Sequence, residues 1–453
     1  MIKTFLQHLG ILLGLALLGL IIHFQLIGVF YLTSIVVLSI ENKKLISVME
    51  MPQAIKQLFG KKKPIIEVKN NNVEFSVVIV NSACQFNLNW KSIDRHFLNI
   101  GGSGAGKSYS WIVPFIYNAA RLKRSTLVYD YEFPSLSGYF EDAFQGQERK
   151  YINFANINKS SRVNPIAPRY MDSVAAARDL AETIVLNLNT GEKDKGSFWV
   201  TSQISFLTGV LWYYRSEKPN ECFLPNIISA IQLVDPLKLL EAISTNIEVE
   251  GVVSSLSTAL KNNSSNQVSG VLGSLQNNLS KLYTKELFYI LGADEVDLNI
   301  SNPEHPINLV VCSNPKLVDV YSPVISLIMS VAMKSMNEGG KQPSTVIIDE
   351  GSTLMIPSLE RVLATCRKNK MSIFLAIQDI SQMNVKYGRD ETKQILANFN
   401  NQIFGKINEL ETAEYCSRIF GKEYVQYQST STSSNGLSMG NLTGFIKGAF
   451  NDL

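Results

Sequence analysis

The spacing of apolar residues changes along this chain and divides it into segments. No charged residue occurs between Lys3 and Glu41, and residues 5–40 are mostly Leu, Ile, Val, Phe and Gly. Apolar runs of strand length begin at about residue 76 and return after residue 300, whereas residues 171–299 place apolar side chains at helical spacing. The pattern therefore predicts a membrane anchor and an α/β layer that is interrupted by an all-α domain.

These changes predict five segments, two of which belong to the same α/β domain. They are an anchor (1–44), a basic juxtamembrane linker (45–75), a first α/β part (76–170), an inserted all-α domain (171–299) and a second α/β part (300–453). Within the insertion, the largely uncharged run from Phe198 to Tyr214 is interrupted by Ser, Thr and Gln. This interruption favours a buried helix over a further membrane span.

The anchor is too long for one straight span. As a single helix, residues 5–40 would reach about 54 Å, against a hydrocarbon core of about 30 Å. A hairpin of two short helices, split near His23 and Gln25, fits this length better, and a single tilted helix is the main alternative. A signal peptide fits less well, because no small-residue cleavage site follows. The lysines of residues 43–63 place everything downstream in the cytoplasm by the positive-inside rule.

A glycine-rich segment follows the first predicted strand of the central layer. Residues 95–100 form a short apolar run, and a helix-compatible run extends to about Ala120. Between them, the pattern GxxxxGK[ST] is formed by Gly101, Gly102, Ser103, Gly104, Ala105, Gly106, Lys107 and Ser108. In such a P-loop, backbone N–H groups curl around phosphates, the lysine reaches the β- and γ-oxygens and the serine hydroxyl ligates Mg²⁺. We therefore predict a site for ATP and Mg²⁺.

A second motif supplies the acidic partner that a P-loop needs. Residues 345–348 form an apolar run that ends in Asp349 and Glu350. This pattern is typical of a Walker B strand, in which Asp349 holds Mg²⁺ through water and Glu350 activates the attacking water as general base. An apolar run ending in an acid is common by itself, but beside a P-loop it predicts hydrolysis rather than binding alone.

Three further residues are candidates for completing the nucleotide site. Asp130 ends the run 125–130 and Gln378 ends the run 372–378, and such carboxyl ends line the ligand crevice of an α/β sheet. Each is a candidate for sensing the γ-phosphate or moving a neighbouring residue, and ordinary capping at a strand end is the alternative for both. Arg367 follows the helix after the Walker B strand and either serves the adjacent subunit as an arginine finger or faces solvent.

Composition narrows the class of protein without indicating a partner. The net charge of +3 is too close to balance to indicate a polyanion. Five widely spaced cysteines without a CxxC pair argue against a disulfide framework or a thiolate zinc site. Four histidines without an HExxH motif argue against a histidine metal centre. Charged residues are 18% of the chain, below the roughly 25% of soluble domains, which agrees with a membrane segment.

Together, these motifs resemble those of the type IV coupling proteins, the membrane-anchored conjugative DNA-transfer ATPases of type IV secretion systems. The resemblance spans most of the chain and includes the anchor, the P-loop and the Walker B strand. Ser197-Phe198-Trp199 and Tyr321-Ser322-Pro323 also match. The most specific block comprises Ile356 to Glu360, Arg367, Gln378, Gln382, Tyr387-Gly388, Ile395-Leu396, Asn398 and Thr412 to Glu414.

The resemblance implies a RecA-like P-loop NTPase domain with an inserted all-α domain, assembled as a homo-hexamer. It also implies ATP-driven delivery of relaxase-bound single-stranded DNA to a type IV secretion channel, from the inner membrane and with most of the chain in the cytoplasm. The positions that match the family's nucleotide site are Lys107, Ser108, Asp349 and Glu350, and those that match its finger and sensor are Arg367 and Gln378.

Three features depart from the family pattern. The turn after the second strand is Asp130-Tyr131-Glu132 rather than basic or glycine-rich, and the membrane region is shorter than the family's common anchor of two spans with a periplasmic loop. The chain also ends soon after Asn435, where further strands are expected, which predicts a truncated or minimal member.

Two functions of different classes agree with these motifs. The first is a DNA-pumping ATPase, which the adjacent Asp349 and Glu350 favour. The second is a membrane docking platform that binds ATP and recruits relaxase or effector proteins with little turnover of its own. A protein-secretion ATPase that carries no DNA is a third reading, and the missing LSGGQ motif argues against an ordinary transporter ATPase. DNA-stimulated ATP turnover separates the first function from the others.

Overall fold

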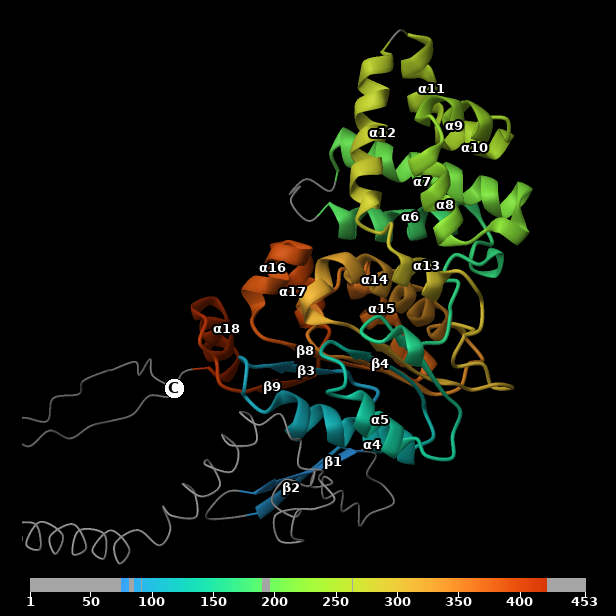
Figure 1. Ribbon diagram of the computed structural model, residues 1–453. Helices are drawn as coiled ribbons and strands as arrows, with labels where there is room; N and C mark the ends of the chain where they lie inside the picture. Colours follow the sequence, from blue (N-terminus) through green and yellow to red (C-terminus); the bar gives the residue numbers. More distant parts are fainter. Residues whose placement is uncertain (1–74, 81–84, 91, 190–195, 263, 422–453) are drawn as a thin grey trace, which may run out of the picture. The chain divides into compact units, whose positions relative to one another are not determined.

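The computed structural model describes residues 75–80, 85–90, 92–189, 196–262 and 264–421 (Figure 1). The chain forms two compact units, residues 1–63 and 64–453, and all described residues belong to the second unit. The predicted membrane anchor, most of the predicted basic linker and the predicted early C-terminal end lie outside the described residues.

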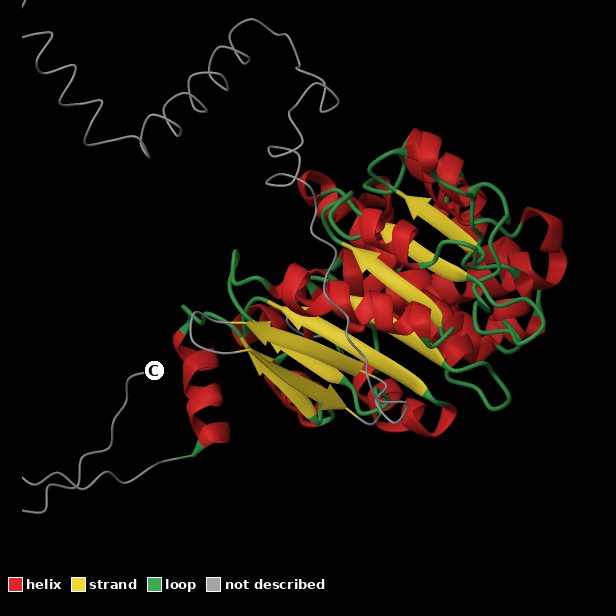
Figure 2. Cartoon of the chain, turned by 90° about the horizontal axis from the view of Figure 1, so that it is seen from below, coloured by secondary structure: helices red, strands yellow, loops and turns green. Residues whose placement is uncertain are grey.

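A parallel sheet forms the centre of the described part, with helices around it (Figure 2). It has seven strands in the order β5-β6-β4-β7-β8-β3-β9. The strands are β3 (Phe97–Ile100), β4 (Ser125–Asp130), β5 (Arg149–Asn153), β6 (Asn308–Cys312), β7 (Ser344–Ile348), β8 (Met371–Ile377) and β9 (Asn401–Phe404). The prediction of a parallel α/β fold is therefore confirmed.

The interior strands are buried on both faces. This burial explains why their positions could be predicted from the pattern of apolar residues. β3, β4, β6, β7 and β8 are buried at every position and form short, nearly continuous apolar runs. β3, β4, β7 and β8 each coincide, within two residues at either end, with an expected run, and β6 falls in the region after residue 300 where strand-like runs were expected to return. The two edge strands β5 and β9 carry more polar, partly exposed residues, so the pattern did not indicate them.

Two helical layers cover the two faces of the sheet. The helices α4 (Val113–Arg121) and α5 (Ser137–Ala143) pack on one face, against alternate residues such as Phe97, Val128 and Phe374. The other face, which includes Leu98 and Leu375, packs against α14 (Val318–Met336), α15 (Leu359–Cys366), α16 (Ile380–Tyr387) and α17 (Arg389–Ala397) (Figure 1). The alternation of partners follows from the two-residue period of a strand.

Among the described residues between β5 and β6, the regular structure consists of helices and a few single helical turns. These helices are α6 (Val174–Leu188), α7 (Phe198–Glu217), α8 (Leu224–Leu233), α9 (Pro236–Ile243), α10 (Ile247–Val252), α11 (Ser254–Lys261), α12 (Ser265–Ser280) and α13 (Lys285–Leu291). Most of α7 is buried, as expected for a core helix. One hydrophobic core runs from these helices to the sheet, so their status as a separate inserted domain stays a prediction.

Two small elements flank the sheet. The antiparallel pair β1 (Phe75–Val80) and β2 (Gln85–Trp90) precedes the main sheet, and the Trp90 indole N–H donates a hydrogen bond to the Asn401 side chain of β9 (3.0 Å). The last described helix is α18 (Leu410–Phe420). The Tyr415 hydroxyl of α18 donates to the Gln402 side chain of β9 (3.1 Å), so the pair and the helix both contact the strand β9 at the edge of the sheet.

One stretch of the described residues, Pro315–Met336, is long and apolar enough to cross a membrane. It contains α14, and 72% of its most apolar window is buried inside the protein. Its apolar surface is therefore used in packing against the sheet and α6.

Candidate nucleotide-binding site

The P-loop begins where β3 ends, between β8 and β9. The loop stays attached to the sheet through Gly101, whose N–H donates to the Ile377 carbonyl of β8 (3.1 Å). Helix α4 follows β3 on one face, whereas α16 and α17 connect β8 to β9 on the other, so the strand order reverses at β3. Open α/β sheets bind ligands at such a switch point.

Two glycines give the loop its shape. Gly104 and Gly106 have φ values of +74° and +78°, in the left-handed region that side chains disfavour. A short π-helical segment, η2 (Ser108–Ile112), then leads into α4. The sequence Gly101 to Ser108 therefore folds as a strand–loop–helix unit, the arrangement in which backbone N–H groups of the loop surround phosphate oxygens.

The segment after β9 supports the loop from its other side, which the sequence pattern did not indicate. The Lys406 carbonyl accepts a hydrogen bond from the Gly102 N–H (2.9 Å), and the Gly405 N–H donates to the Ile100 carbonyl (2.7 Å). These are backbone contacts between residues about three hundred positions apart, made because β9 pairs with β3. Their only sequence signal is a single glycine after a weakly apolar run.

Lys107 is buried beneath the loop that it belongs to. Its ammonium donates to the Gly101 carbonyl (2.6 Å) and lies 3.7 Å from the Glu350 Oε2 atom. Only 8% of Lys107 is exposed, so its charge acts in a poorly solvated environment where its attraction for phosphate is strong. The structure thus brings together the P-loop lysine and the predicted general base.

Glu350 follows β7 in a conformation that is uncommon for glutamate. Its φ of +57° is left-handed, and the turn is closed by Thr353, which donates to the Glu350 carbonyl from its N–H (3.0 Å) and its hydroxyl (2.7 Å). The Tyr129 hydroxyl contacts the Thr353 hydroxyl (3.1 Å) and fixes this turn to β4. Strained backbone of this kind is concentrated at functional sites.

One oxygen of the Glu350 carboxylate accepts a hydrogen bond and the other has no hydrogen-bonding partner. Its Oε2 accepts a hydrogen bond from the Gln378 amide (3.2 Å), which projects from the end of the neighbouring strand β8. Its Oε1 is buried and has no hydrogen-bonding partner. A buried carboxylate oxygen without a partner is costly, and a water molecule at this position would satisfy it.

The donor set fits a magnesium ion. Asp349 is 7% exposed, and burial, together with the carboxylates of Glu350 and Asp130, raises its pKa to about 7, against the opposing effect of Lys107. A divalent cation would compensate this concentration of buried negative charge, and hard cations prefer the carboxylate and hydroxyl oxygens that Asp349 and Ser108 offer. These two residues are therefore suited to hold Mg²⁺ together with nucleotide phosphates.

Asp130 has a local structural role. Its Oδ2 accepts hydrogen bonds from the N–H groups of Leu136 (3.1 Å) and Ser137 (2.9 Å), at the start of α5. This is the capping alternative for Asp130, and burial raises the pKa of its carboxyl. Gln378, the other strand-end candidate, instead contacts a site residue.

Arg367 lies at the amino end of β8, whereas the P-loop lies at the carboxyl ends of the strands. It begins the single turn η8 (Arg367–Asn369) just before β8, and its side chain is exposed. At about 3.3 Å per residue, the length of β8 separates it from the P-loop edge by on the order of 20 Å. The structure therefore does not bring Arg367 to the nucleotide site of its own chain.

A parallel α/β sheet with a P-loop at its switch point, and a buried Asp-Glu pair two strands away, defines the class of P-loop NTPase folds. The model of the family described as "Type IV secretory system Conjugative DNA transfer" matches residues 41–443. The chain belongs to this family.

Solved structures of coupling proteins share the fold at low sequence identity. The bacterial conjugative coupling protein TrwBΔN70, in an unbound form, aligns with a TM-score of 0.62 and 17% identity over 76% of each chain. The plasmid coupling protein TrwB in complex with ADP and Mg²⁺ aligns with a TM-score of 0.60 and 17% identity, over 74% of this chain and 76% of that one. VirB4 of Thermoanaerobacter pseudethanolicus aligns with a TM-score of 0.50 and 13% identity, over 78% and 88%. No curated protein sequence matches the chain.

Proposed function

We propose that this protein is a membrane-bound ATPase that couples relaxase-bound single-stranded DNA to a type IV secretion channel and pumps the DNA during conjugative transfer. Membership in the conjugative DNA-transfer family supports the process, and the similarity in fold to TrwB, solved with ADP and Mg²⁺, supports the cofactors. The protein would act at the inner membrane as a homo-hexamer.

One observation carries the proposal of hydrolysis rather than nucleotide binding alone. Glu350 is placed beside Lys107 with one carboxylate oxygen held by Gln378 and the other buried without a partner. The free oxygen is the position at which a water molecule would be held and deprotonated as it attacks the γ-phosphorus. A carboxylate at this position can accept a proton from water, a role that nucleotide binding alone does not require.

The other site residues bind and orient the substrate. Backbone N–H groups of residues 101–106 would surround the phosphates, and Lys107 would leave Gly101 and Glu350 to neutralise the β- and γ-oxygens. Ser108 and Asp349 would hold Mg²⁺, which supplies charge neutralisation of the phosphates when bound. Gln378 would follow changes at the γ-phosphate through its bond to Glu350.

Arg367 would act on a different subunit. Its exposure and its position at the far edge of the sheet agree with a role as an arginine finger in the nucleotide site of a neighbour in the hexamer. Each site would then be complete only at a subunit interface.

The test is ATP hydrolysis by the full-length protein in detergent, with and without single-stranded DNA. We expect turnover that rises with DNA and that is lost in Lys107→Ala and Glu350→Gln. Nucleotide binding without turnover, even with DNA present, would contradict the motor and favour a docking platform. Turnover that DNA does not change would instead favour a protein-secretion ATPase.

A further inference from the structure

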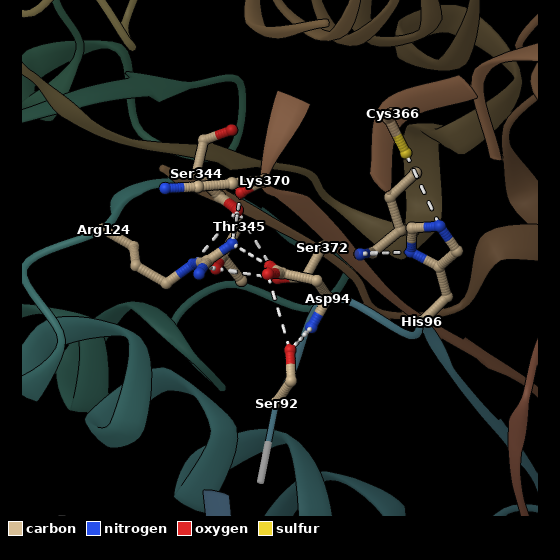
Figure 3. A network of polar contacts seen from close by, with 10 residues as sticks. Ser92, Asp94, His96, Arg124, Ser344, Thr345, Cys366, Lys370 and Ser372 are labelled. Atoms are coloured by element: carbon tan, nitrogen blue, oxygen red, sulfur yellow. Dashed lines mark hydrogen bonds and ion pairs between the residues drawn. The ribbon is translucent and has the colours of Figure 1, made fainter. Parts of the chain in front are cut away.

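Arg124 links the amino ends of four adjacent strands, β4, β7, β8 and β3 (Figure 3). The P-loop lies at the opposite, carboxyl ends of the strands. Its guanidinium donates to the Ser344 carbonyl (2.8 Å from Nη2) and the Thr345 hydroxyl (3.0 Å from Nε), at the start of β7. It also donates to the Asp94 carboxylate before β3 (2.7 Å) and to the Lys370 carbonyl before β8. We call these five residues the Arg124 network.

The centre of the Arg124 network is buried, whereas Asp94 at its margin is partly exposed. Arg124 itself precedes β4 and is 5% exposed, and Ser344 and Thr345 are fully buried. The guanidinium is planar and presents its donors in a fixed fork, so a set of acceptors at these positions accepts an arginine but no other side chain.

His96 makes a second connection beside the Arg124 network. Its Nδ1 accepts a hydrogen bond from the Ile373 N–H of β8 (3.1 Å), so its Nε2 carries the proton and donates to the Leu363 carbonyl of α15 (3.1 Å). The Cys366 sulfur lies 3.6 Å from the same Nε2 (Figure 3). The imidazole therefore joins the end of α15 to strands β3 and β8.

The two connections hold the segment that presents Arg367. His96 fixes this segment at Leu363 and Cys366, before Arg367, and Arg124 fixes it at Lys370, after Arg367. Between these two points the chain makes the single turn η8 and leaves Arg367 exposed. An exposed side chain thus stands on a turn whose two ends are attached to the core of the sheet.

We propose that Arg124 is a positioning residue that holds the 366–370 turn so that Arg367 reaches the nucleotide site of the neighbouring subunit. This inference rests on the proposed role of Arg367 as an arginine finger. Stabilisation of a transition state depends on placement, and an error of about 1 Å in the position of a catalytic group costs on the order of 100-fold in rate. β3, β7 and β8, which carry the nucleotide site at their carboxyl ends, thereby set the finger at their amino ends together with β4.

The first test replaces Arg124 by lysine in the full-length protein. Arg124→Lys keeps a positive charge opposite Asp94, but a single ammonium group cannot bond Ser344, Thr345 and Lys370 together. We expect kcat for ATP to fall on the order of 10- to 100-fold while the affinity for Mg²⁺–ATP stays within about twofold of wild type. The matched control is Arg169→Lys, which alters a bidentate arginine–aspartate pair elsewhere (Arg169 with Asp294) and should leave kcat unchanged.

A second variant covers the case in which Arg124→Lys does not fold. Asp94→Asn leaves Arg124 and its bonds to β7 in place and removes the charge of its carboxylate partner. We expect the same pattern at smaller size, a lower kcat with unchanged nucleotide affinity. A purely structural role of the Arg124 network would instead lower stability and nucleotide affinity together and leave kcat per folded site unchanged.

Mixed assemblies separate positioning from general damage. Lys107→Ala subunits have an inactive site and an intact finger, whereas Arg124→Lys subunits have an intact site and a displaced finger. Mixing the two should restore turnover, because Lys107→Ala subunits donate Arg367 to the sites of Arg124→Lys subunits. Mixing Arg124→Lys with Arg367→Ala should restore nothing, and the double variant should be no slower than Arg367→Ala alone.

The outcomes distinguish this inference from the proposed function. Full turnover in Arg367→Ala would contradict the role of Arg367 as an arginine finger, and the proposed role of Arg124 would be contradicted with it. If Arg367→Ala is inactive but Arg124→Lys keeps the wild-type kcat, only the positioning role of Arg124 is overturned. An Arg124→Lys defect that mixing with Lys107→Ala does not relieve would overturn it as well.

Discussion

Replacing Glu350 by glutamine removes the proposed general base with almost no change in shape. The amide keeps the size of the side chain and its position beside Gln378, but it cannot accept a proton from water. General-base catalysis contributes about 100- to 10,000-fold to a rate, so we expect ATP turnover to fall by this factor, which equals about 3 to 5 kcal/mol of transition-state stabilisation.

Nucleotide binding should respond differently from turnover. Glu350 lies 3.7 Å from the Lys107 ammonium, where two unit charges attract each other with a gross energy of about 4 kcal/mol at an effective dielectric constant of 20. This attraction competes with phosphate for Lys107, and the variant also loses one negative charge near the γ-phosphate. The affinity of Glu350→Gln for Mg²⁺–ATP should therefore be equal to wild type or higher.

The assay combines single-turnover hydrolysis with an equilibrium titration of nucleotide on the same preparation. The control is Glu304→Gln, an exposed glutamate in the loop before β6, which should leave both quantities unchanged. Turnover within about threefold of wild type, together with intact binding, would refute Glu350 as the base. A loss of affinity as large as the loss of turnover would show that the carboxylate shapes the site rather than activating water.

Gly106→Ala places a side chain at a φ of +78° and should weaken nucleotide binding about tenfold in a titration, whereas Gly146→Ala, at +83° and away from the loop, should not. Phe115→Ala opens the aromatic cluster that α4 forms with Phe97 of β3 and Phe374 of β8, and it should cost about 3–5 kcal/mol in urea denaturation. A loss below about 1 kcal/mol would contradict that packing. Burial lowers the pKa of His96 below 6.5, so below that pH the unfolded chain binds a proton that the folded chain does not. Stability should therefore fall with decreasing pH from about 6.5, by up to about 1.4 kcal/mol per pH unit, and His96→Gln should lose this component.

Buried runs and local motifs were the predictable part of this molecule. β4 and β7 could be placed because both of their faces are covered, which makes the strands apolar throughout. Lys107 and Glu350 could be selected because each belongs to a short motif with a physical purpose. Lys107 and Glu350 approach each other directly, and Gln378 donates to the same carboxylate, in agreement with the expectation that the carboxyl ends of the strands line one crevice.

The features that escaped prediction depend on contacts between distant parts of the chain. β9 is polar and partly exposed, and it is a strand because β3 pairs with it, which also brings Lys406 to the P-loop. Arg124 bonds to Ser344 across 220 positions, and a single arginine before a strand carries no sign of such partners. Edge strands and long-range polar contacts are products of the tertiary structure, so no local pattern encodes them.

The location of Arg367 shows the limit of a motif-based assignment. Its position after the Walker B helix suggested either a finger or a solvent-facing residue, and the sequence could not separate the two. The length of β8 now excludes action on the nucleotide of the same chain. The mixing of variants tests its action on a neighbouring subunit.

The central claim is that the carboxyl ends of β3, β7 and β8 form a site for Mg²⁺–ATP. The most direct measurement is a calorimetric titration of ATP into the full-length protein, with Mg²⁺ and with a chelator. We expect wild type to bind more tightly with Mg²⁺ than without it, Asp349→Asn to lose this difference, and Lys107→Ala to bind at least tenfold more weakly. Equal affinity of Lys107→Ala and wild type would contradict the claim.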